Sequence, residues 1–183
     1  MWRLVFLIAL VGCAPVDQSS VRYVAAIEVV LKQPQDRVDL VAILRQPAAR
    51  VGLHVDDGSA KWREFERQAK QIPTPDQVTF NVGVWRGEND DEPVAFADDR
   101  FHQGRVWVTF LQGTEPNRFK PYRDTALQAI RRRWPDAKPL PILPSGGLPL
   151  ASDLVSTAGG YRIVRSSAAR YELSPSLPIF AAE

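Results

Sequence analysis

The sequence predicts an α+β fold, a single domain in which helices pack on one face of a mainly antiparallel sheet. Three consecutive segments between residues 78 and 112 look like strands, and two of them, Val78–Trp85 and Arg105–Gln112, place apolar side chains with a period of two. Segments with helical spacing of apolar residues precede and follow this run. The composition, 45% hydrophobic and 24% charged, is that of an ordinary globular domain.

The first two elements are a strand and a helix. Val21–Lys32 is rich in β-branched residues and its charged residues share one parity, which favours a strand over a helix. Asp36–Gln46 places Val38, Val41 and Leu44 three apart, with Leu40 and Ile43 alongside, and stops before Pro47. That pattern predicts a short helix.

A second strand, a second helix and a meander follow. Arg50–Asp56 is a predicted strand, and after the Asp57-Gly58 turn Ser59 can cap a helix. The apolar face of this helix consists of Trp62, Phe65, Ala69 and Ile72. The three predicted strands between residues 78 and 112 are then expected to pair as an antiparallel meander. They are Val78–Trp85, Pro93–Arg100 and Arg105–Gln112.

The last third of the chain begins with a helix from Pro121 to Trp134, with Leu127, Ile130 and Trp134 facing inward. After it we expect a strand at Lys138–Leu143 and a loop at Leu148–Gly160. A hairpin of Tyr161–Arg165 with Arg170–Leu173 is expected next, and Ser174–Glu183 is expected to trail along the surface. The order of elements is loosely that of a ferredoxin-like split βαβ arrangement with one extra meander strand.

The N-terminus has the layout of a secretory signal. Arg3 precedes the apolar run Leu4–Val11, which is too short to cross a bilayer because a spanning helix needs about 20 residues. The run ends in Leu10-Val11-Gly12-Cys13, which resembles the lipobox of bacterial lipoproteins at all four positions. The resemblance implies cleavage after Gly12, diacylglycerol on the Cys13 thiol and a fatty acyl chain, such as palmitate, on the new amino group.

The resemblance divides the chain into a signal peptide (1–12), a lipidated cysteine with its tether (13–20), a globular domain (21–173) and a C-terminal tail (174–183). Cys13 is the only cysteine, and a thiol without an internal partner is a liability in an oxidising compartment unless it is modified. Ala14 stands where an aspartate would favour inner-membrane retention, so we expect a lipid-anchored, periplasmic protein on the outer membrane. The alternative is an ordinary signal peptide with an incidental cysteine, or a buried apolar strand.

The charge balance argues against a nucleic-acid partner. Residues 1–12 contain Arg3 and no acid, so the remaining 171 residues carry 22 basic and 21 acidic side chains, a net charge of +1. Such a balance gives no electrostatic basis for binding an anionic polymer. Because no cysteine pair is available, packing rather than disulfides must stabilise the fold.

No catalytic or metal site, and no cofactor, is expected. With only two histidines, His54 and His102, a three-histidine zinc site is excluded. His54 and Asp56 would lie on one side of a strand and can form an acid–base pair, although a surface histidine is the simpler interpretation. Ser145 lacks the surroundings of a nucleophile elbow, and the paired aspartates lack the spacing of a calcium loop.

The strongest indication of a binding surface is the pairing of tryptophans with arginines in the meander, Trp85 with Arg86 and Arg105 with Trp107. Both tryptophans lie on the strand faces opposite the valine rows, so if those rows face the helices, the two tryptophans share the other side of the sheet. If this side is open, stacking and charge suit it to bind a protein or a glycan. If the C-terminal segment covers it, the tryptophans belong to a core.

Three functions remain open. The leading hypothesis is a non-catalytic envelope lipoprotein, attached to the membrane through Cys13, that binds another envelope component through one face of its sheet. The second is a hydrolase that uses His54 and nearby carboxylates. The third is an inhibitor or immunity-type lipoprotein that binds one exported enzyme, for instance through the acidic turn Glu88–Glu92.

Overall fold

The computed structural model describes residues 22–68, 80–87, 92–102, 104–115 and 117–181, and it confirms the α+β class. The sheet contains β1 (Tyr23–Val30), β2 (Leu53–Asp57), β3 (Asn81–Arg86), β4 (Glu92–His102), β5 (Arg105–Leu111) and β6 (Lys138–Pro139). Its strands lie in the order β2-β3-β4-β5-β1-β6, and every neighbouring pair is antiparallel. The helices are α1 (Pro34–Arg50), α2 (Ser59–Gln68) and α3 (Lys120–Arg133).

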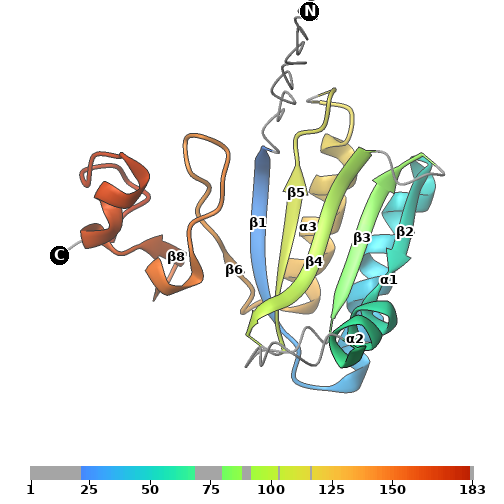
Figure 1. Cartoon of the computed structure of the whole chain (residues 1–183). Helices are drawn as coiled ribbons and strands as arrows, with labels where there is room; N and C mark the ends of the chain where they lie inside the picture. Colours follow the sequence, from blue (N-terminus) through green and yellow to red (C-terminus); the bar gives the residue numbers. More distant parts are fainter. Residues whose placement is uncertain (1–21, 69–79, 88–91, 103, 116, 182–183) are drawn as a thin grey trace, which may run out of the picture.

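The topology uses the split βαβ arrangement twice. Helix α1 joins β1 to β2, which lie apart with the β3–β5 meander between them, and α3 joins β5 to β6 across β1. Helices α1 and α3 cover one face of the sheet (Figure 1). The sheet contains two strands more than the four-stranded ferredoxin-type pattern, where the sequence predicted one.

Helix α1 is longer than predicted. It continues through Pro47, whose ring is buried, to Arg50. Its buried stripe runs through Leu40 and Leu44 at a spacing of four residues. Of the apolar residues that indicated this helix, Leu44 is therefore buried, whereas Val38 is 60% exposed.

Helix α2 begins at Ser59, whose side chain does not act as the predicted helix cap. The Ser59 hydroxyl donates to the backbone carbonyl of Asn81 (3.2 Å) and accepts from the Asn81 N–H (2.9 Å). These bonds join the start of α2 to the start of β3. The predicted inward side chains of Phe65, Ala69 and Ile72 lie outside the side chains that the structure describes.

Helix α3 buries Tyr122, Ala126 and Ile130, and Trp134 at its C-terminal end is buried as well. The prediction was therefore right for Ile130 and Trp134, whereas Leu127 is half-buried beside the core. Because Tyr122, Ala126 and Ile130 are spaced by four residues, Leu127 lies at the flank of this stripe. The main core fills the space between α1, α3 and the sheet.

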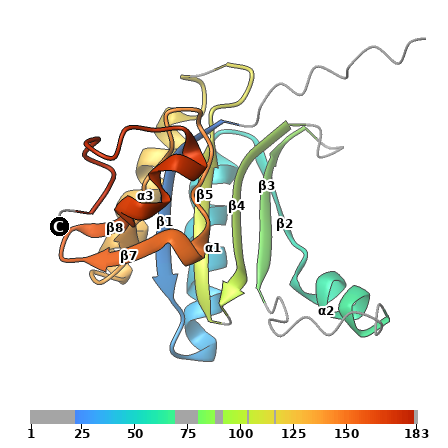
Figure 2. The same ribbon diagram turned by 60° about the vertical axis from the view of Figure 1, so that its left-hand side comes forward.

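The residues after β6 form a second layer, here called the C-terminal segment (residues 140–181). It contains the 3-10 helix η1 (Ala151–Asp153), the hairpin of β7 (Leu154–Thr157) with β8 (Gly160–Ile163), and the 3-10 helix η2 (Arg165–Tyr171). The predicted loop at Leu148–Gly160 is therefore partly a strand, and the predicted hairpin around Ser166–Ala169 is wrong. Figure 2 shows this segment in front of β1.

The last described residues do not trail along the surface as predicted. Phe180 is buried with Ile163 and Ala168, and the backbone of Ile163 bonds to Ile179 and Ala181 at 2.9 and 2.8 Å. The apolar side chains of this end, which include Leu177 and Ile179, form a small core of their own within the C-terminal segment. Among the described residues, no helix combines the length and the apolar character needed to span a membrane.

Candidate functional site

The face of the sheet opposite α1 and α3, here called the outer face, carries both predicted tryptophans. Strand register places Trp107 between Glu28 and Asp98, and Trp85 opposite His54. The parity argument from the sequence is therefore correct. The two tryptophans nevertheless have different surroundings, because the C-terminal segment covers only part of this face.

Trp107 belongs to a core. Only 5% of it is exposed, and it packs with Ala26 and Leu140 beneath partly buried residues of the C-terminal segment that include Leu154 and Tyr161. The expectation that Trp107 belongs to an open binding surface is thus corrected. Over β5 and β1, the C-terminal segment covers the outer face, which was the alternative considered from the sequence.

Arg105 is occupied by a network around the buried carboxylate of Glu28. Glu28 Oε1 accepts from Arg105 Nη2 (2.6 Å) and from the Tyr161 hydroxyl (2.7 Å), and Oε2 accepts from Trp107 Nε1 (3.1 Å). The hydrogen bond to Glu28 raises the pKa of Arg105, while burial, followed by the bond to Glu28, raises the pKa of Tyr161. Because Tyr161 lies on β8, this network fastens the C-terminal segment to the sheet.

Trp85 lies on the part of the outer face that the C-terminal segment leaves free. Figures 1 and 2 both show this segment beside β1 and β6, away from β2, β3 and β4. Trp85 meets Phe96 edge to face, with ring centroids 5.1 Å apart at 85°. The indole lies over Gly83, where an added Cβ would be 2.3 Å from Trp85 Nε1. Glycine at this position lets the ring lie flat on the sheet.

We call Trp85 and Phe96 the aromatic patch. Both residues are half-buried, and exposed His54 lies directly across the strand pair from Trp85. Arg86 does not extend the patch, because it lies on the other face and pairs with Glu92 (2.9 Å) and Glu115 (3.3 Å).

The Arg86 ion pairs belong to a structural cluster at one end of the sheet. Glu92 Oε1 accepts from the backbone N–H and the hydroxyl of Thr114, both at 2.7 Å. The Thr114 backbone bond is the main cause of a lowered pKa at Glu92, and Arg86 adds to it. Of the four residues proposed for the binding surface, only Trp85 therefore presents its side chain to the open part of the outer face.

The arrangement around His54 does not form a catalytic pair. Asp56 lies on the same face of β2, but its carboxylate faces Lys61 at 3.7 Å. Ser145 Oγ accepts from the Gly147 N–H within a turn, at 3.4 Å. Among the residues that the structure describes, no three His, Cys, Asp or Glu side chains are grouped as metal ligands. The acidic residues 88–91 and Cys13 lie outside the described residues.

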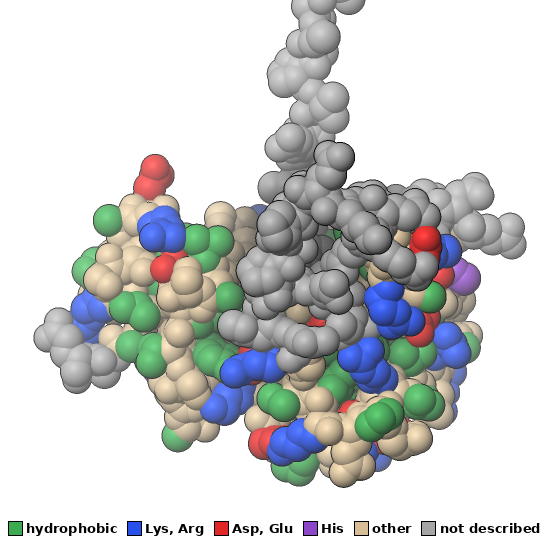
Figure 3. Space-filling model, turned by 60° about the horizontal axis from the view of Figure 1, so that its bottom comes forward, with side chains coloured by type: hydrophobic (Ala, Val, Ile, Leu, Met, Phe, Trp, Pro, Cys, Tyr) green, Lys and Arg blue, Asp and Glu red, His purple; other side chains and the backbone are tan. Residues whose placement is uncertain are grey.

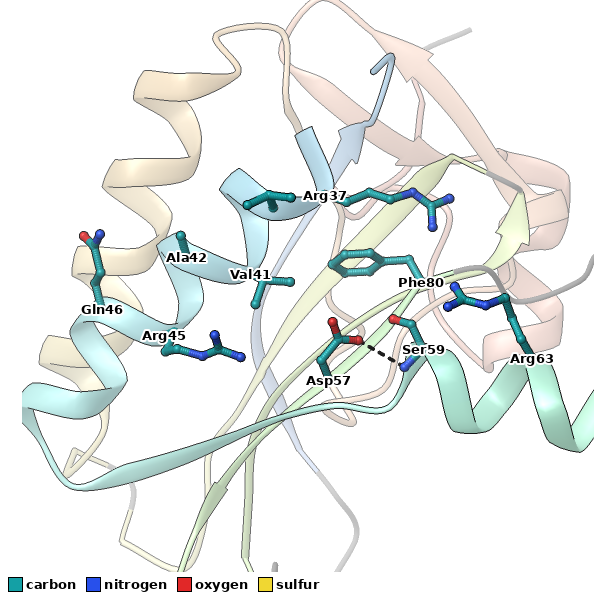
Figure 4. A pocket seen from close by; sticks show the side chains of 10 residues that line it. Arg37, Val41, Ala42, Arg45, Gln46, Asp57, Ser59, Arg63 and Phe80 are labelled. Carbon is teal, nitrogen blue, oxygen red and sulfur yellow. Dashed lines mark hydrogen bonds between the residues drawn. The ribbon is translucent and has the colours of Figure 1, made fainter. Parts of the chain in front are cut away.

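A pocket of about 540 Å³ that the sequence did not predict lies between α1 and α2 (Figure 4), and we call it the α1–α2 pocket. Val41 and Phe80 lie at its apolar base, and Arg37, Arg45 and Arg63 line its sides. These residues come from two helices and the start of β3, so only the tertiary fold brings them together. A weak signal existed in α1, where residues 37, 41 and 45 share a helical face.

Comparison with known proteins does not assign a family. No protein-family description matches the chain, and no solved structure does. A stretch of 74 residues, 39% of the chain, is 35% identical to part of the S-adenosylmethionine:tRNA ribosyltransferase-isomerase of Rhizorhabdus wittichii. The chain spans only 19% of the length of that enzyme.

Proposed function

We propose that this chain is a lipid-anchored protein of the bacterial envelope that works as a non-catalytic binding module, and that the aromatic patch is its contact with a protein partner. The observation that carries the proposal is the edge-to-face pair of Trp85 and Phe96 on the part of the outer face that the C-terminal segment leaves free. Aromatic side chains held rigidly at a surface are typical anchors of protein interfaces.

The proposed anchor limits where the partner can be. Lipid on Cys13 would leave a tether of eight residues, 13–20, before the folded part. An extended chain of that length reaches at most about 28 Å. The complex would therefore form close to the membrane, whether the partner is itself a membrane protein or a soluble protein that diffuses there.

The test places a photo-crosslinking amino acid at His54 in cells. This position is exposed and lies opposite Trp85 across the strand pair, so a bound partner should form a defined adduct there. The same amino acid at Arg132, exposed on α3 behind the sheet, should give no such adduct. The Trp85→Ala change should abolish the His54 adduct, since loss of a central anchor costs about 2 kcal/mol or more of binding, roughly thirtyfold in affinity.

Two results would contradict the proposal. One is a His54 adduct that survives Trp85→Ala, since the tryptophan would then contribute nothing to binding. The other is loss of the fold in that variant. Melting the purified Trp85→Ala protein beside the wild type separates a binding defect from a folding defect.

A further inference from the structure

The α1–α2 pocket has no part in the proposed partner surface, yet it has the size of a ligand site. Its volume of about 540 Å³ lies within the range of roughly 300–1,000 Å³ that small-molecule sites occupy. It opens between two helices next to β2 and the start of β3, whereas the aromatic patch lies on the outer face of the sheet.

The charged residues of the pocket favour an anion. Arg37 and Arg45 extend from α1 toward α2, and Arg63 extends back from α2 toward Phe80 (Figure 4). Asp57 is the one acid among the described lining residues, and its carboxylate accepts from the Ser59 N–H at 3.1 Å. The charged side chains among the described lining residues are therefore three arginines and one aspartate. Figure 3, which brings this end of the molecule forward, shows Lys and Arg side chains on the exposed surface with Asp and Glu side chains among them.

The apolar residues of the pocket favour a ligand that is more than a bare ion. Val41 and the ring of Phe80 form the base, and Val38, which also lines the pocket, is 60% exposed. A ligand that covered Val38 and Val41 would remove this apolar surface from water.

We infer that the α1–α2 pocket binds a phosphate-bearing ligand with a small apolar body. Arginine forks match phosphate oxygens in pairs, and a phosphate monoester carries about −1.5 to −2 charges at neutral pH, so a phosphate suits a site lined by three arginines and one aspartate. The phosphate can come from a soluble ester or from the headgroup of an anionic lipid. Both sources present the same group to the arginines.

Isothermal titration calorimetry of the full-length protein in a neutral detergent, with phenyl phosphate as the probe, tests this inference. We expect saturable binding that weakens as salt is raised from 0.05 to 0.3 M, because the attraction is partly electrostatic. Inorganic phosphate and phenol, each carrying half of the probe, should bind at least about tenfold more weakly. Equal affinity for inorganic phosphate would overturn the part of the inference that concerns the apolar body.

Two variants test the arginines. Arg45→Gln and Arg63→Gln should each weaken phenyl phosphate binding about tenfold or more, as expected for loss of a charged hydrogen bond. The matched control is Arg50→Gln, which removes an exposed arginine of α1 that does not line the pocket and should change affinity less than twofold. Arg45 is itself exposed, so Arg45→Gln should melt like the wild type.

Two further measurements identify the source of the phosphate group and separate this inference from the proposed function. Displacement of phenyl phosphate by phosphatidylglycerol in mixed micelles, but not by phosphatidylcholine, would assign a lipid headgroup, and no displacement by either would assign a soluble ester. Trp85→Ala should leave phenyl phosphate binding unchanged. Absence of saturable binding, or binding that is the same in Arg45→Gln and Arg63→Gln as in the wild type, would overturn the inference.

Discussion

Tyr122 shows how a single buried hydroxyl constrains stability. Its ring packs against Phe110 in the main core, and its hydroxyl has no hydrogen-bond partner among the described residues. A buried polar group without a partner costs about 1–3 kcal/mol. Burial also raises the pKa of Tyr122 far above its usual 10.0, because a charged phenolate would be desolvated in the core.

We therefore expect Tyr122→Phe to leave the free energy of unfolding unchanged or to raise it by about 1–2 kcal/mol at pH 7. The raised pKa means that, above pH 10, the unfolded chain loses the Tyr122 proton while the folded chain keeps it. Wild-type stability then falls with rising pH by up to about 1.4 kcal/mol per unit from this group, and the variant lacks that loss. Urea titrations between pH 7 and 11 measure both effects, and a variant less stable than the wild type at every pH would contradict them.

Residue-scale patterns in the sequence located the tryptophans but not their environments. The parity of β3 and β5 placed Trp85 and Trp107 correctly on the outer face. Which of them is covered depends on Leu140 and Tyr161, which lie more than 30 residues further along the chain than Trp107. Such long-range packing leaves no local periodicity, so the sequence could only pose the alternatives.

At the scale of elements, α1 and α3 are joined through Asp36. Its buried carboxylate accepts from the backbone N–H groups of Lys32 and Gln33, at 2.8 and 2.9 Å, and from Arg133 Nη2 at 2.9 Å. Arg133 also donates to Asp39 at 2.8 Å and lies over the Trp134 ring. The start of α1 is thereby fixed to the end of α3.

Arg133→Ala should lower the free energy of unfolding, because it removes a charged hydrogen bond to the buried carboxylate of Asp36. Its matched control is Arg132→Ala, one residue away and exposed, which should change stability by less than about 0.5 kcal/mol. Guanidinium titrations of both proteins make the comparison. Similar losses in the two variants would show that the bonds to Asp36 and Asp39 contribute nothing.

Most elements followed from local pattern, and the failures have different causes. The six sheet strands and three helices were all expected from the sequence. The β7–β8 hairpin was missed because Gly159-Gly160 was interpreted as loop punctuation, whereas Thr157 pairs with Gly160 at the hairpin end. The residues that line the α1–α2 pocket lie between positions 37 and 80. Their spacing along the sequence does not indicate that the fold brings them together.

At the scale of the whole molecule, the proposed anchor is the feature that the folded part cannot reveal. If Cys13 carries lipid, mass spectrometry of the protein extracted from membranes should show an N-terminal Cys13 with added acyl mass. Cys13→Ala should leave the precursor uncleaved after Gly12 and free of acyl mass. A wild-type protein that keeps Met1, or that carries no lipid, would contradict the anchor and leave the binding surface to be judged separately.

The place of β1 in the sheet has a consequence for biogenesis. Strand β1 pairs with β5 and β6, which end at residues 111 and 139. Glu28 on β1 also accepts a hydrogen bond from Tyr161, which lies still further along the chain. A polypeptide threaded N-terminus first through a translocation channel cannot complete such a sheet until nearly its whole length has emerged. Because pairing over so much of the chain is slow, an exported chain, as the proposed anchor implies, would stay unfolded longer than a domain built from local contacts.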